Sequence, residues 1–100
     1  MRYLSPACIA RHEPAMRARG VSTVARSPRG FLPAWKRAGG DPAKLSPYWR
    51  RRREGFIARH MAQMDRRHEP PRGPDGAPTR RHLALIAWAY SPERGCPAPR

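Results

Sequence analysis

The sequence has few large apolar residues, which limits the size of any fold. Leu, Ile, Val and Phe together contribute 12 of the 100 residues, below the roughly 20% at which a highly charged chain is expected to be disordered. A large hydrophobic core and a buried parallel sheet are therefore excluded. No stretch approaches the about 20 consecutive apolar residues of a transmembrane helix, so we predict no membrane partner.

Acidic residues are also scarce: seven Asp and Glu accompany 21 Lys and Arg, giving a formal net charge of +14. These acids are scattered and lack the paired-carboxylate spacing of catalytic sites, and the chain has no nucleophile elbow or phosphate loop. We therefore predict that the protein is not an enzyme and needs no cofactor. Positive charges in such excess repel one another in a compact chain, and a polyanion relieves that repulsion. The composition thus indicates a nucleic-acid partner, DNA rather than RNA.

The chain contains only two cysteines, Cys8 and Cys96. No apolar signal segment follows the first residue, so we expect a reducing compartment and free thiols; a disulfide that closes this long loop is the alternative. Cys8 and His12 are four residues apart and would share a helix face, as half of a zinc site does. We predict no metal, because no second close pair exists among the remaining candidates, His60, His68, His82 and Cys96.

Proline and glycine divide the chain into short segments. Serine followed by proline marks a helix start, and glycine marks a helix end. The predicted helices span 6–12, 14–19, 33–38, 46–67 and 79–90, with a short turn near 41–44 and a proline-rich loop over 68–78. We therefore predict an all-α fold. Its small helix–loop–helix domain covers 31–91, with short accessory helices, a flexible basic N-terminal arm over 1–30 and a disordered tail over 92–100.

Aromatic side chains supply the predicted core. The segment 79–90 is apolar nearly all round, so we expect it to form the buried centre of the domain. With so few aliphatic residues available, rings must provide most of the buried area. The expected core residues are Phe31, Trp35, Trp49, Phe56 and Trp88.

The predicted helix 46–67 separates an apolar stripe from an arginine-rich face. At 100° per residue, Arg52, Arg59 and Arg66 fall within about 40° of one another, and successive members are about 10 Å apart along the axis. Arg53 points instead into the apolar stripe. There it must either extend its charge to the surface or meet a buried acid.

The arginines predict contacts with phosphate groups. Positive charge in the first turn of a helix opposes the helix dipole, so the run at 50–53 suits a bound anion; a solvated basic face is the alternative. Tyr48, beside this run, is a candidate for stacking on a base. The predicted nucleic-acid-binding residues are Arg50, Arg51, Arg52, Arg59, Arg66, Arg80, Arg81 and Tyr48.

The expected function is sequence-tolerant binding or compaction of double-stranded DNA. One Gln and no Asn are present to read bases. The segments 27–30 and 71–74 have a composition typical of arms in the minor groove, although an ordinary turn is the favoured interpretation. Docking on an acidic protein surface and association with RNA or the ribosome are the alternatives. We expect the protein in the cytoplasm or on the nucleoid, or in a virion.

The end of the chain carries a short motif. Gly76-Ala77-Pro78-Thr79-Arg80 precedes Leu83-Ala84-Leu85 and Trp88-Ala89. This arrangement resembles the C-terminal part of small basic uncharacterised proteins encoded by phages and other large DNA viruses. The resemblance covers about a quarter of the chain. It implies a DNA-associated accessory protein and no particular activity.

Overall fold

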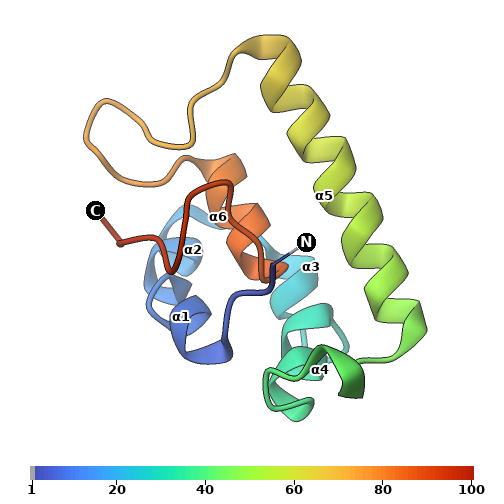
Figure 1. Cartoon of the computed structure of the whole chain (residues 1–100). Coiled ribbons are helices and arrows are strands. Elements are labelled where there is room, and N and C mark those ends of the chain that lie inside the picture. The colour runs from blue at the N-terminus through green and yellow to red at the C-terminus, as the bar shows by residue number, and fades with distance from the viewer. Residues whose placement is uncertain (1) are drawn as a thin grey trace.

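Short helices and one long helix make up the computed structural model, which describes residues 2–100 (Figure 1). Within these residues there is no β-sheet, only an isolated bridge between Arg72 and Pro78. The prediction of an all-α fold is confirmed. The elements are α1 (Pro6–Ala10), α2 (Glu13–Arg19), α3 (Thr23–Arg26), α4 (Phe31–Arg37), the 3₁₀ turn η1 (Pro42–Lys44), α5 (Pro47–Arg67) and α6 (Arg80–Ala87).

Hydroxyl caps start three of these helices. Ser5 Oγ accepts a hydrogen bond from the Cys8 amide at 3.1 Å at the start of α1. Ser46 does the same for the Trp49 amide at 3.3 Å, before α5, and Thr79 for the His82 amide at 3.1 Å, before α6. Each cap satisfies an amide that has no partner inside the helix.

Helix α6 lies in the middle of the molecule, with α1 and α2 on one side and α5 on the other (Figure 1). Leu85, Ile86 and Ala87 are completely buried. The ring of Trp88, just after the helix, stacks on Phe31 with 4.9 Å between ring centroids. The predicted aromatic core is confirmed: Phe31, Trp35 and Trp88 are buried, and Trp49 and Phe56 pack against them partly exposed.

The N-terminal segment belongs to the same core. Ile9 and Met16 are completely buried in it, and the Leu4 amide donates to Ala89 O at 2.8 Å. This corrects the prediction of a flexible arm over 1–30 for the described part, residues 2–30. The helices α1, α2 and α3 each contribute only one or two buried residues, but α2 packs against α6, whose residues Leu83, Leu85, Ile86 and Ala87 are buried.

The C-terminal segment is also attached to the body of the protein. Cys8 and Cys96 form a disulfide across 88 positions of sequence, and Pro97 is buried beside them. The predictions of free thiols and of a disordered tail over 92–100 were therefore wrong. The chain reverses after α6 and returns along α1, a path that local sequence patterns do not encode.

Helix α5 is a 21-residue rod at the edge of the molecule (Figure 1). It starts at Pro47, continues without interruption to Arg67, and ends where His68 adopts a left-handed conformation with φ of 51°. Between residues 2 and 100, no helix has both the length and the apolar character required to cross a bilayer.

Candidate nucleic-acid interface

Three arginines form an exposed line along α5, which we call the arginine ridge (Arg52, Arg59 and Arg66). All three are exposed. The two acids of the helix, Glu54 and Asp65, lie on a different face by helical geometry. Within residues 2–100, no acid is within 4.0 Å of any ridge guanidinium. The ridge is therefore an uncompensated row of positive charge.

Gly55 lies between the first two members of the ridge. A Cβ atom placed on Gly55 would lie 3.3 Å from Arg59 Nη1, so the missing side chain lets the guanidinium of Arg59 lie close to the helix. Glycine inside a helix costs about 1 kcal/mol relative to alanine. At Gly55 this cost accompanies the close approach of the Arg59 guanidinium to the helix.

Arg52 lies against two aromatic rings. Its guanidinium carbon is 5.6 Å from the ring centroid of Tyr48 and 5.7 Å from that of Trp49, and its Nη1 donates to Tyr48 Oη at 2.7 Å. Tyr48 is 50% exposed. The predicted stacking residue is therefore accessible, and it is linked directly to the ridge.

A cavity of about 240 Å³, which we call the aromatic hollow, opens beside this end of the ridge. Val24 and Tyr48, the most exposed of the large apolar side chains, both line it. Its volume is below the roughly 300 Å³ of a typical small-molecule pocket, which suits a single ring system. The lining residues are Val24, Ser27, Arg29, Gly30, Phe31, Tyr48, Trp49, Arg52 and Trp88.

Of the residues that line the hollow, only Tyr48 and Arg52 were predicted as site residues; Val24 and Arg29 are among those that were not. The sequence signal for Arg29 was the Ser-Pro-Arg-Gly segment at 27–30, which we interpreted mainly as a turn. The structure places this turn against the start of α5, so that Arg29 and Arg52 line the same cavity. Nothing in the sequence indicates that the exposed Val24 lies there too.

Arg53 lies inside the protein. Its side chain is 1% exposed, and Nε donates to Trp88 O at 2.7 Å. Burial lowers the pKa of this guanidinium from its ordinary value. Neither alternative offered by the sequence is correct: the charge does not reach the surface and meets no acid, but instead contacts main-chain oxygens and the ring of Tyr3, 3.7 Å from its centroid.

The remaining predicted arginines are not equivalent. Arg81 is held by Glu69, with Nε 3.0 Å from Oε2, and by His60, with Nη1 2.8 Å from Nδ1. Arg80 is exposed and donates to the main-chain oxygen of Arg19. Because the donors of Arg81 are occupied inside the fold, we do not include it in the interface. Arg50 is half-buried and Arg51 is exposed.

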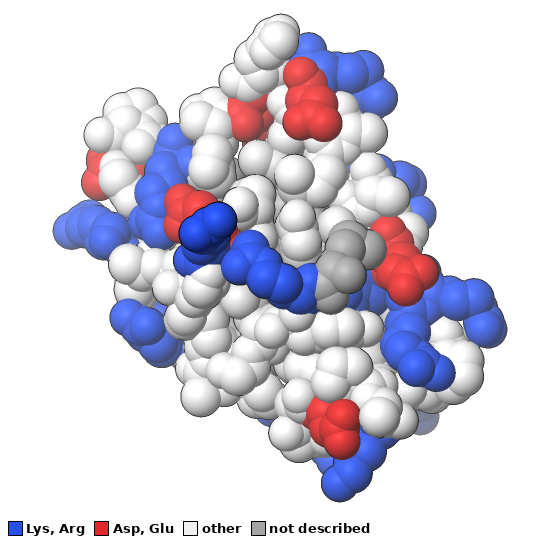
Figure 2. Space-filling model, in the orientation of Figure 1, with Lys and Arg blue, Asp and Glu red and all other residues white. Residues whose placement is uncertain are grey.

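Basic side chains project along the outer edge of α5 in Figure 2, where Figure 1 places this helix. Acidic and basic groups lie side by side on the face of the molecule turned toward the viewer.

Comparisons with protein-family models, curated proteins and solved structures found no match to this chain. The arginine ridge and the aromatic hollow are therefore interpreted from their own geometry.

Proposed function

We propose that the protein binds nucleic acid, double-stranded DNA in the first place, without sequence preference and without catalysis. One observation carries the proposal: Arg52, Arg59 and Arg66 are exposed on one face of an unbroken helix that has no acid on that face. Their spacing of about 10 Å exceeds the Debye length of about 8 Å at physiological salt. The three charges therefore repel each other little, and each is available to a separate phosphate.

Binding occurs by neutralisation of phosphates. A guanidinium donates two parallel hydrogen bonds to a phosphate, which makes arginine better suited to this contact than lysine. Each neutralised phosphate releases a counterion, so the affinity falls with salt. If about six phosphates are engaged, the logarithm of the affinity falls against the logarithm of salt concentration with a slope of about −5. Compaction of DNA, or an accessory role on it in the nucleoid or a virion, fits such binding.

A second candidate is single-stranded nucleic acid, which the aromatic hollow favours. Tyr48 and Trp49 offer ring faces there, and Arg29 and Arg52 offer charge for the adjoining phosphates. Stacking of an unpaired base on an aromatic side chain contributes about 1–3 kcal/mol. Duplex DNA has such bases only at its ends, so a preference for single strands would identify the hollow as the main site.

Titration of tryptophan fluorescence with duplex DNA at two salt concentrations tests the proposal, since Trp49 lies at the hollow. We expect a saturable signal whose midpoint moves to higher DNA concentration as salt rises. Competition with single strands, structured RNA and an acidic peptide of equal charge then ranks the partners. If the acidic peptide displaces DNA at equal concentration, DNA binding would no longer be the proposed function. Docking on an acidic protein would take its place.

A further inference from the structure

Three potential metal ligands meet at the junction of the two chain ends. Cys8 lies in α1, His12 directly precedes α2, and Cys96 lies in the C-terminal segment. One ligand atom from each lies within 4.8 Å of the other two. The sequence pairs only Cys8 with His12; the fold supplies Cys96 as the third member. In the structure the two cysteines are joined as a disulfide.

His12 has a buried nitrogen without a partner. The residue is 1% exposed, and its Nε2 lies 2.8 Å from Pro97 O. A carbonyl oxygen can only accept, so Nε2 carries the hydrogen and the neutral ring keeps its lone pair on Nδ1. This Nδ1 is buried and has no hydrogen-bond partner. An unsatisfied buried group of this kind costs about 1–3 kcal/mol in stability. The unpaired Nδ1 of His12 therefore indicates a functional role.

The orientation of His12 is that of a metal ligand. Histidines that bind metals almost always donate their second ring N–H to a carboxylate, a main-chain carbonyl or water, which fixes the ring and the tautomer. Pro97 O supplies this contact here. One ring nitrogen of His12 belongs to the same small cluster as the two sulfur atoms, and Nδ1 is the nitrogen without a hydrogen-bond partner.

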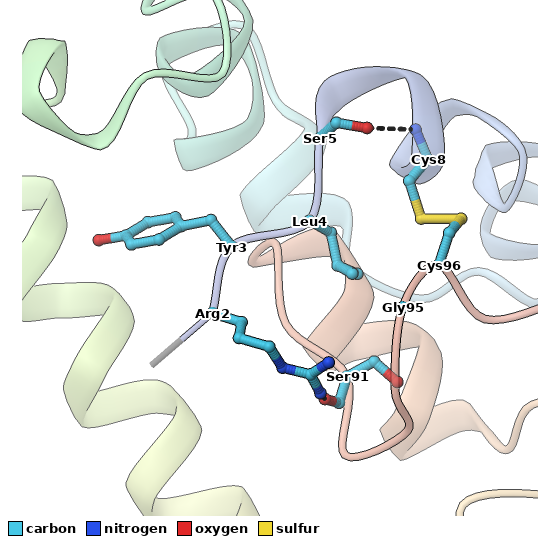
Figure 3. A pocket seen from close by; sticks show the side chains of 8 residues that line it. All are labelled: Arg2, Tyr3, Leu4, Ser5, Cys8, Ser91, Gly95 and Cys96. Carbon is cyan, nitrogen blue, oxygen red and sulfur yellow. Dashed lines mark hydrogen bonds between the residues drawn. A yellow bond between two sulfur atoms is a disulfide. The ribbon is translucent and has the colours of Figure 1, made fainter.

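A cavity of about 240 Å³ leads to the disulfide (Figure 3). Cys8 and Cys96 line it together with Ser5 and Gly95. Cys96 is exposed, whereas Cys8 is 6% exposed. A small reductant or an ion therefore reaches the sulfur atoms from solvent without any unfolding of the core.

We propose that reduction of the Cys8–Cys96 disulfide converts this cluster into a zinc site, with Cys8 Sγ, Cys96 Sγ and His12 Nδ1 as ligands and water in the fourth position. Two thiolates and one imidazole form a known tetrahedral zinc ligand set with an open position. At a Zn–S distance of about 2.3 Å, the two sulfur atoms lie about 3.8 Å apart. The two sulfur atoms are bonded to each other in the structure, so they must move apart after reduction to reach this separation.

The conversion needs a two-electron reductant, for which a small dithiol is sufficient. The S–S bond breaks as the dithiol supplies two electrons and two protons and becomes a disulfide itself. Zinc then displaces both thiol protons into solvent, and the two thiolates cancel the charge of the ion. The same three residues thus hold either a disulfide or a metal, according to the redox state.

Cobalt(II) titration of the full-length protein tests this proposal, because cobalt reports thiolate ligands by its charge-transfer absorption. The protein is reduced without oxygen by a phosphine and compared with its oxidised form. We expect one equivalent of cobalt to bind the reduced form with thiolate charge-transfer bands, zinc to remove them, and the oxidised form to show none. Absence of these bands in the reduced protein would overturn the proposal.

Substitutions separate this site from unspecific binding. Cys96→Ser and His12→Gln should each weaken cobalt binding at least tenfold in the reduced protein, whereas His68→Gln, at an exposed histidine, should not change it. Equal binding by all three variants would contradict the assignment. If reduction unfolds the chain, zinc must restore its helical circular dichroism; a chain that stays unfolded with zinc present would also overturn it.

Discussion

Arg53 Nε donates a hydrogen bond to Trp88 O at 2.7 Å, and this contact attaches α5 to the end of α6. Nη2 of the same guanidinium donates to Ala89 O at 2.8 Å and to Arg2 O at 2.6 Å. The C-terminal end of a helix carries partial negative charge, so a buried cation is stabilised there without an acid. One side chain thereby joins the long helix, the central helix and the N-terminal segment.

Loss of this side chain should destabilise the protein strongly. Arg53→Met leaves the oxygens of Trp88 and Arg2 without their guanidinium donor, at a cost of about 1–3 kcal/mol for each that stays buried and unpaired, while Ala89 O keeps the Leu4 amide. We expect a loss of about 3 kcal/mol or more in the free energy of unfolding, measured with urea. Arg51→Met, at an exposed neighbouring position, should cost less than about 0.5 kcal/mol. Equal losses in the two variants would contradict the role of Arg53.

Replacement of Gly55 should have the opposite effect. Alanine is favoured over glycine by about 1 kcal/mol in a helix, and the atom that its Cβ approaches is the end of the exposed, flexible Arg59 side chain. Gly55→Ala should therefore raise the free energy of unfolding by up to about 1 kcal/mol. Urea unfolding measures this change, and a destabilised variant would show that Arg59 cannot move.

Stability should fall as the pH falls below 6.5. Burial lowers the pKa of the His82 imidazole from its ordinary value of 6.5, and it lowers the pKa of His12 in the same way. The unfolded chain therefore binds protons that the folded protein excludes. The stabilisation is complete above pH 6.5 and is lost as the pH falls toward the folded-state pKa. Thermal unfolding between about pH 7.5 and 5 measures it.

His82→Gln isolates one contribution to this pH dependence. His82 Nδ1 lies 2.9 Å from Pro71 O, and Nε2 lies 2.7 Å from Ser91 Oγ. The variant should lose part of the decrease in melting temperature below pH 6.5, and His68→Gln serves as the exposed control. Glu93 does not interfere, because Arg72 holds its pKa below the ordinary value of 4.5. An unchanged pH profile in His82→Gln would refute the assignment.

Reduction of the disulfide should destabilise the fold when a chelator is present. The cross-link spans 88 positions, and removing a native disulfide from a small domain typically costs about 2–5 kcal/mol. Urea unfolding with and without a phosphine reductant measures the difference, and Cys8→Ser should match the reduced form. A reduced protein as stable as the oxidised one would show that core packing alone holds the chain ends.

The local features of this fold were predictable from the sequence. Serine and proline at positions 46 and 47 mark the start of α5. Because no proline follows until Pro70, the helix continues without interruption to Arg67. The seven-residue spacing of the arginine ridge requires only helical geometry. The buried position of α6 follows from its apolar residues between Leu83 and Ala87.

Contacts between distant segments were not predictable. The partners of Arg53 are main-chain oxygens, which every residue carries and no sequence pattern marks. The pairing of Cys8 with Cys96 depends on where the chain travels after α6. The aromatic hollow likewise joins the turn at 27–30 to the start of α5, and the sequence shows each of these parts only separately.

The salt dependence of DNA binding tests the central claim most directly. A variant with Arg52, Arg59 and Arg66 all changed to Gln is compared with one in which Arg17, Arg37 and Arg94, exposed on other segments, are changed in the same way. Both lose three charges. We predict that only the ridge variant binds duplex DNA much more weakly and that its log–log salt slope becomes shallower by about 2 to 3. Equal slopes in the two variants would contradict the assignment of the ridge.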